Sequence, residues 1–115
     1  MINIEETGNL IIVAVIGEFT LADFKQFEDQ VLYKFHFNGE ANLLFDWRDL
    51  VSYSVDVAWE EIKFMREHGS KINRVAVVTD SQWQLWGAWV SNLFTEANVV
   101  VFSDYDEAYA WINVD

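Results

Sequence analysis

The chain alternates four times between a short run of β-branched or aromatic residues and a segment whose apolar residues recur every three or four positions. The first pattern is typical of buried strands, and the second is typical of amphipathic helices. This alternation predicts an α/β domain with a mostly parallel sheet. The four strand–helix pairs are Leu10–Ile16 with Leu21–Phe35, Ala41–Trp47 with Val55–His68, Arg74–Thr79 with Gln82–Thr95, and Val99–Phe102 with Tyr105–Ile112.

A fifth strand is predicted at the N-terminus, where Met1–Glu5 alternates between apolar and polar residues. The turn formers Gly8 and Asn9 separate it from Leu10–Ile16, so we expect an antiparallel hairpin that places Met1–Glu5 at the edge of the sheet. Residues 1–115 are therefore expected to form a single domain with a five-stranded mixed sheet, an antiparallel N-terminal strand and about four helices.

Capping residues mark the ends of several predicted helices. Thr20 is suited to the N-cap of the first helix, and Asp23 stands at its third helical position, as in a capping box. Gly39 is expected to end that helix, and Asp104 is expected to cap the last one. The segment from Arg48 to Ser54 is interpreted as a long connection.

The charge and composition exclude several classes of protein. Seven basic and nineteen acidic residues give a formal net charge of −12, which disfavours nucleic acids and anionic lipid surfaces as partners. The chain has no cysteine, which excludes disulfides, zinc–thiolate sites and cysteine nucleophiles. The longest apolar run, Leu10–Ile16, is far shorter than the roughly 20 residues that cross a bilayer, so no membrane insertion is expected. The acidic N-terminus lacks the features of a secretory signal, and we expect a cytoplasmic protein.

Three aspartates follow or end predicted parallel strands, the edge at which open α/β sheets bind ligands. Asp46, Asp80 and Asp104 could together hold Mg²⁺ in a hydrolase or phosphotransfer site. Alternatively, Asp80 and Asp104 cap helices and Asp46 bonds to loop backbone, which we favour because the residues of a phosphoaspartate or P-loop site are missing. The two histidines, His36 and His68, are expected to cap or pack. We predict no catalytic residues, no metal site and no cofactor.

The third predicted helix is unusual because Gln82–Phe94 has no charged residue and an apolar arc wider than one core contact requires. This aromatic surface is interpreted in three ways: an interface between two copies, the wall of a groove for a lipid or other apolar ligand, or packing against the second helix within the domain. Two residues of the second helix flank the groove. The candidate interface or groove residues are Trp59, Phe64, Trp83, Trp86, Trp89 and Val90.

The order and the packing landmarks of the chain resemble the SpoIIAA-like family, small bacterial domains of the STAS type. The resemblance covers essentially the whole chain. It implies a five-stranded sheet with an antiparallel first strand and helices on its faces, shared with anti-sigma-factor antagonists and, more loosely, with CRAL-TRIO lipid-binding domains. It does not imply an enzyme. Its landmarks are Ala58–Phe64, His68, Ile72–Asp80, Val101–Phe102 and Glu107–Ile112.

The resemblance also points to a switch position at the start of the second helix. Antagonists of this family are phosphorylated on a serine in an Asp-Ser-Ser-Gly motif, and the corresponding stretch here is Ser54–Val57. The serine pair and the glycine are missing from it. Asp56 and Ser54 are the candidate switch residues, and dipole stabilisation of the helix N-terminus alone also accounts for Asp56.

These observations favour a non-catalytic cytosolic module that acts by docking to a protein partner and forms a homodimer through its third helix. The alternative is a binding protein for a lipid or other apolar small molecule, held between the second and third helices by their aromatic side chains.

Overall fold

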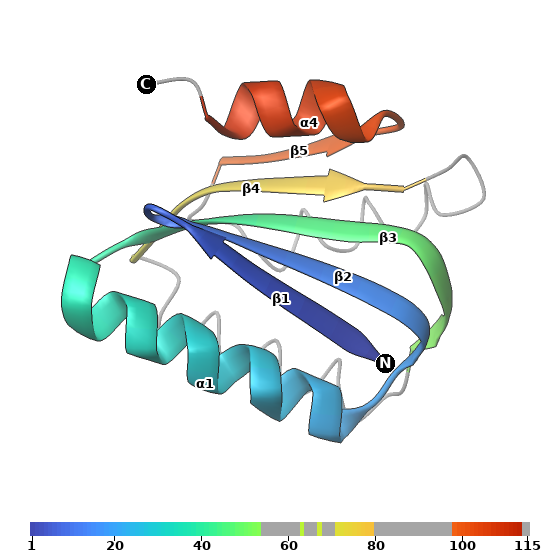
Figure 1. Cartoon of the computed structure of the whole chain (residues 1–115), viewed down its shortest axis with the longest axis horizontal. Helices are drawn as coiled ribbons and strands as arrows, with labels where there is room; N and C mark the ends of the chain where they lie inside the picture. Colours follow the sequence, from blue (N-terminus) through green and yellow to red (C-terminus); the bar gives the residue numbers. More distant parts are fainter. Residues whose placement is uncertain (54–62, 64–66, 68–70, 80–97, 114–115) are drawn as a thin grey trace.

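The computed structural model describes residues 1–53, 63, 67, 71–79 and 98–113. In these residues a sheet lies between one long helix and one short helix (Figure 1). The elements are β1 (Ile2–Thr7), β2 (Leu10–Phe19), α1 (Leu21–Asn38), β3 (Ala41–Tyr53), β4 (Ile72–Val78), β5 (Asn98–Phe102) and α4 (Tyr105–Ile112).

The sheet contains five strands in the order β1-β2-β3-β4-β5. β1 pairs antiparallel to β2 over six residue pairs, from Ile2 opposite Val15 to Thr7 opposite Leu10, and the remaining pairs of strands are parallel. The turn between β1 and β2 contains Gly8 with φ of +61°, a conformation that glycine adopts without steric cost. The predicted mixed sheet with an antiparallel edge strand is confirmed.

Side chains that alternate along the strands form one apolar core on each face of the sheet. On one face Val13, Phe45 and Val77 pack with the buried stripe of α1. On the other face Leu44 and Ala76 pack with Ala108 and Ile112 of α4. The α1 stripe is the predicted one: Phe24, Phe27, Val31 and Phe35 are buried, and Leu21 is partly buried against the same core.

The predicted caps of α1 are confirmed. The Asp23 backbone N–H donates to the Thr20 hydroxyl oxygen at 3.2 Å, and the Thr20 backbone N–H donates to the Asp23 carboxylate at 3.2 Å, which is a capping box. Burial raises the pKa of Asp23, but the hydrogen bonds from Thr20 and the nearby N-terminal ammonium outweigh it and lower the pKa below its ordinary value. Gly39 ends the helix with φ of +81°.

β3 is longer than the sequence predicts, because the segment from Arg48 to Tyr53 is strand and not a connection. β2 likewise continues to Phe19. Between the pairs Ala14–Asp46 and Ile16–Asp49, β2 contributes one residue and β3 contributes two, which is a β-bulge. The bulge lets Trp47 and Leu50, three positions apart, both enter the core on the α1 side.

Of the roughly four helices predicted, the described residues contain α1 and α4. The predicted helices at Val55–His68 and Gln82–Thr95 lie outside the described residues, apart from isolated positions. Neither α1 nor α4 combines the length and the hydrophobicity that crossing a bilayer requires.

Candidate functional site

Part of the sheet on the α4 side is left open. α4 contacts mainly β3, β4 and β5. On β2 the side chains of Leu10 and Ile12 are buried in the same core, and the face becomes exposed further along the strand, at Ile16. Three apolar side chains are exposed there: Met1 (74%), Ile16 (47%) and Val51 (74%). Met1 and Ile16 exchange two backbone hydrogen bonds of 3.0 and 2.9 Å, which places their side chains on the same face.

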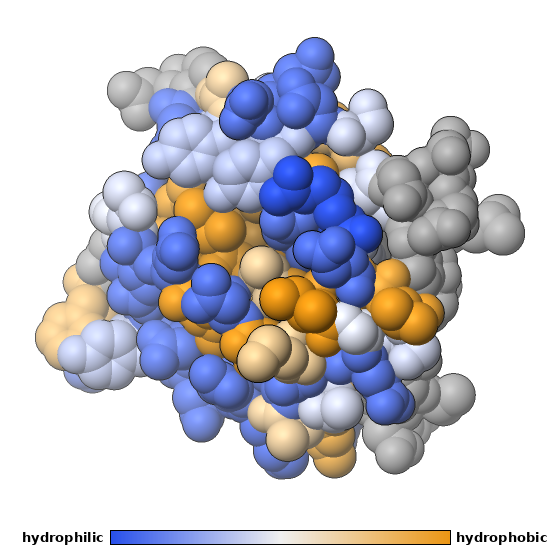
Figure 2. Space-filling view, turned by 45° about the vertical axis from the view of Figure 1, so that its right-hand side comes forward, coloured by the Kyte–Doolittle hydropathy of each residue, from blue (hydrophilic) through white to orange (hydrophobic). Residues whose placement is uncertain are grey.

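We call this surface the open face and define it by residues of three adjacent strands. Val51 is the extra residue of β3 at a second register shift, between the pairs Gly17–Leu50 and Glu18–Ser52. It belongs to the open face because it is 74% exposed and because Leu50 before it is buried in the core on the α1 side. Figure 2 shows apolar surface between the levels of α4 above and α1 below, bordered by hydrophilic residues. The open face consists of Met1, Asn3, Glu5, Ile12, Ala14, Ile16, Asp46, Arg48, Asp49 and Val51.

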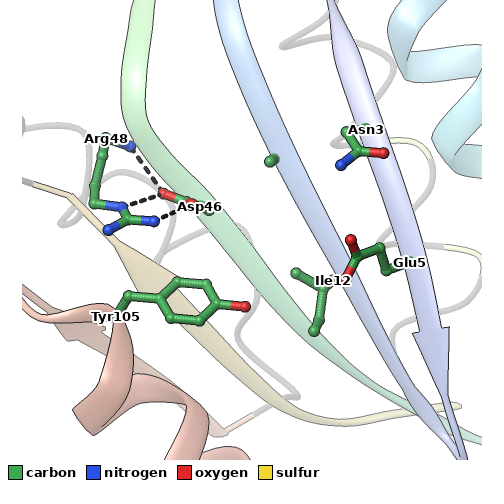
Figure 3. Close-up of a pocket in the computed structure, with 7 residues that line it drawn as sticks. Asn3, Glu5, Ile12, Asp46, Arg48 and Tyr105 are labelled. Atoms are coloured by element: carbon green, nitrogen blue, oxygen red, sulfur yellow. Dashed lines mark hydrogen bonds and ion pairs between the residues drawn. The ribbon is translucent and has the colours of Figure 1, made fainter.

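A pocket of about 200 Å³ lies where the open face meets the N-terminus of α4. Its floor is β2, one wall is β1, and the opposite wall is formed by β3 and α4 (Figure 3). Its lining residues are Asn3, Glu5, Ile12, Ala14, Asp46, Arg48 and Tyr105.

An ion pair on β3 forms the charged wall of the pocket. The Arg48 guanidinium donates two hydrogen bonds to the Asp46 carboxylate, from Nε at 2.8 Å and from Nη2 at 2.7 Å. The backbone N–H of Arg48 also donates to Asp46 Oδ1 at 3.2 Å. The hydrogen bonding of the guanidinium to Asp46 is the main reason that the pKa of Arg48 is raised above its ordinary value. Such a bidentate pair fixes both side chains.

Tyr105 is held between this ion pair and the rest of α4. Asp104 caps the helix by accepting from the Asp106 backbone N–H at 3.3 Å. The Arg48 guanidinium carbon lies 4.9 Å from the centre of the Tyr105 ring, a cation–π contact. The ring stacks on Tyr109 with centroids 6.2 Å apart. Burial, followed by the negative charges of Asp46 and Glu5, raises the pKa of Tyr105 above its ordinary value, so the hydroxyl is neutral and can donate.

We expect the Asp46→Asn substitution to lower the pKa of Tyr105. It removes an anion that disfavours the phenolate and leaves the Arg48 cation beside the ring. NMR titration of the Tyr105 ζ-carbon measures this pKa directly, and Asp49→Asn on the same strand serves as the control with no expected change. Because the folded-state pKa of Tyr105 is raised, its contribution to stability is present below pH 10 and is lost as the pH rises through that pKa. An unchanged Tyr105 pKa in Asp46→Asn would contradict this arrangement.

Three polar groups of the pocket are not used by the protein itself. Within the described part of the chain, neither the Glu5 carboxylate, the Asn3 amide nor the Tyr105 hydroxyl forms a side-chain hydrogen bond or ion pair. In Figure 3 the Glu5 carboxylate and the Tyr105 hydroxyl extend toward the middle of the pocket from opposite walls. These groups are therefore available to an incoming ligand.

Comparison with known proteins identifies the family of this chain and solved structures with the same fold. The profile of the SpoIIAA-like family matches residues 10–113. The chain belongs to the SpoIIAA-like family. A solved structure of an uncharacterised protein with a SpoIIAA-like fold from Shewanella loihica PV-4 is 25% identical, with a TM-score of 0.77 over 97% of this chain and 92% of that one. No curated protein sequence matches this chain.

Two further structures share the fold of this SpoIIAA-like protein at lower identity. The anti-sigma factor antagonist SpoIIAA in its unphosphorylated form is 8% identical, with a TM-score of 0.67 over the whole of both chains. An anti-sigma factor antagonist from Mycobacterium paratuberculosis is 13% identical, with a TM-score of 0.63 over 99% of this chain and 94% of that one.

Two of the three aspartates predicted at the strand ends of the SpoIIAA-like protein have the structural roles that we favoured. Asp104 caps α4, and Asp46 bonds to the backbone of Arg48. Asp46 is also engaged by the Arg48 guanidinium, which the sequence analysis does not anticipate. Asp80 lies outside the described residues. Within those residues, no three His, Cys, Asp or Glu side chains gather as a metal site.

Of the two histidines considered in the sequence, His36 is exposed in the last turn of α1 and makes an edge contact with Phe37, with ring centroids 5.2 Å apart. The other predicted site residues lie outside the described part of the SpoIIAA-like protein. The predicted interface, groove and switch therefore stay predictions. The residues concerned are Ser54, Asp56, Trp59, Phe64, Trp83, Trp86, Trp89, Val90 and His68.

Sequence reasoning missed Glu5, Arg48 and Tyr105 as pocket residues. A signal existed for Glu5, because the alternation in β1 puts Asn3 and Glu5 on one face. The sequence pattern predicts a connection at Arg48, so it does not indicate that Arg48 lies two residues after Asp46 on the same strand. Tyr105 reaches the pocket only because α4 packs beside β3. This is a tertiary contact that local sequence patterns do not indicate.

Proposed function

We propose that this SpoIIAA-like protein is a non-catalytic regulatory module that docks a protein partner on its open face. The observation that carries the proposal is the combination, on one sheet, of exposed apolar side chains with a pocket in which Asn3, Glu5 and Tyr105 form no side-chain hydrogen bond within the described part of the chain. Protein interfaces commonly pair an apolar patch with a few fixed polar groups. The acidic chain favours a partner surface that is basic around an apolar centre.

The named relatives support a regulatory role. Two of the structures that share the fold are described as antagonists of anti-sigma factors, which is a regulatory role. In the described pocket, Arg48 holds one of the two carboxylates, Asp46, and the other, Glu5, has no hydrogen-bonded partner among the described residues that would orient it as a general base. This arrangement is better suited to recognition than to proton transfer.

Site-specific photo-cross-linking tests the docking. A photoreactive amino acid replaces Val51 on the open face or, as the matched control, Asp29 on the exposed side of α1, in the cells from which the gene comes. We expect one discrete protein adduct from position 51 and none of the same size from position 29. Equal adducts from both positions, or adducts from neither, would contradict docking on the open face.

Self-association through Trp83, Trp86 and Trp89, and a cytoplasmic location, stay predictions of the sequence. The alternative of a lipid or apolar ligand in a groove lined by Trp59 and Phe64 has no support among the described residues, because all of its predicted walls lie outside them.

A further inference from the structure

We propose that the pocket beside α4 receives a lysine or arginine side chain of the docking partner, with the Glu5 carboxylate as its counter-ion. This inference rests on the proposed function, because it names the chemistry that the partner presents to the open face.

The charges of the pocket favour a cation. The lining contains two carboxylates, Glu5 and Asp46, and one guanidinium, Arg48. Arg48 already holds Asp46 through two short hydrogen bonds, so the unmatched charge in the pocket is the negative charge of Glu5. A carboxylate or phosphate ligand would enter against Glu5 and would have to compete with Asp46 for Arg48.

The hydrogen-bonding groups also match a basic side chain. Glu5 supplies acceptor oxygens on one wall, and the neutral Tyr105 hydroxyl supplies a further acceptor on the opposite wall. An ammonium has three donors and a guanidinium has five, and neither has an acceptor. The protein therefore offers several acceptors, on both sides of one pocket, to a group that only donates.

The shape of the site fits a long side chain that comes from the partner. The pocket volume of about 200 Å³ is many times the roughly 10–15 Å³ that one water molecule needs on a comparable measure. The floor is apolar, formed by Ile12 and Ala14 of β2, and would contact the methylene stem of a lysine or arginine. The exposed Ile16 follows along the same strand, so an apolar residue beside the basic one in the partner would contact it.

NMR titration with single amino-acid derivatives tests this pocket without requiring the partner. The full ¹⁵N-labelled chain is titrated with Nα-acetyl-arginine amide, Nα-acetyl-lysine amide, Nα-acetyl-glutamine amide and inorganic phosphate. We expect the two basic probes to shift the amide resonances of Glu5, Ile12 and Arg48 in a saturable way, with a dissociation constant of about 1 mM. The glutamine derivative and phosphate are expected to cause no saturable shift at these residues.

Two variants of β1 with the same change of charge provide the control. Glu5→Gln is expected to weaken binding of the basic probes about tenfold. Glu6→Gln removes the same charge from the neighbouring residue, which lies on the opposite face and pairs with Lys34, and is expected to leave binding unchanged. Equal binding by both variants, or binding of phosphate in place of the basic probes, would overturn the inference. An absent response here together with an intact Val51 cross-link would reject the basic side chain while leaving docking on the open face in place.

Discussion

Replacing Ile16 with aspartate is expected to abolish the cross-link from position 51. Ile16 is half exposed near the middle of the apolar part of the open face, with Met1 paired beside it. A carboxylate at this position would be buried without a partner when an apolar surface docks on it. Loss of a central contact of this kind costs about 2 kcal/mol or more, which is about thirtyfold in affinity. The yield of the position-51 adduct measures the effect.

The matched control for Ile16→Asp is Tyr33→Asp on α1. Tyr33 is 61% exposed and lies on α1. Tyr33→Asp therefore also replaces a large exposed side chain with a carboxylate, but does so away from the open face. Both variants should retain the fold, because substitutions at exposed positions change the free energy of unfolding by about 1 kcal/mol or less. A position-51 adduct that survives Ile16→Asp at full yield would show that the partner does not use the open face.

Replacing Phe27 with alanine is expected to lower the free energy of unfolding by about 3–5 kcal/mol. Phe27 is 3% exposed and its ring lies 5.6 Å from that of Phe24 and 5.4 Å from that of Phe45, so it joins α1 to β3. The truncation leaves a cavity between helix and sheet that neither can close without moving. Urea denaturation followed by circular dichroism measures the loss.

Phe37→Ala on the same helix removes an equal number of atoms and is the control. Phe37 is 66% exposed and contacts Tyr33 and His36 at the surface, so its loss should cost less than about 1 kcal/mol. Similar destabilisation by the two variants would mean that the α1 stripe is not the main contact between helix and sheet.

Most of the described fold could be predicted because local signals agreed with the tertiary arrangement. The spacing of Phe24, Phe27, Val31 and Phe35 determines which side of α1 is buried, and the capping box at Thr20 marks where the helix begins. The alternation in β1 and the turn at Gly8 predicted the antiparallel edge strand. Each of these signals depends on residues close together in the sequence, where propensity and periodicity act directly.

The end of β3 and the pocket could not be predicted in the same way. The polar run Arg48–Asp49 looks like a connection, because a strand pattern that contains a bulge no longer alternates. The pocket joins Glu5 and Tyr105, residues a hundred positions apart, and only the register of β1 on β2 and the packing of α4 bring them together. The sequence places Asp46 among three aspartates at strand ends and favours a backbone bond over a metal for it, but gives no sign that the Arg48 guanidinium also satisfies it.

The extra residue of β3 has a consequence for how this protein tolerates changes in length. Trp47 and Leu50 lie on the same side because the bulge accommodates one residue more than strict alternation allows. Deleting one residue between them would leave them two positions apart, which regular alternation also places on one side, so the strand would close the bulge and keep Leu50 in the core. Homologues that vary in length should therefore lose a residue more readily here than in the regularly paired parts of β3, where a deletion would reverse every side chain that follows.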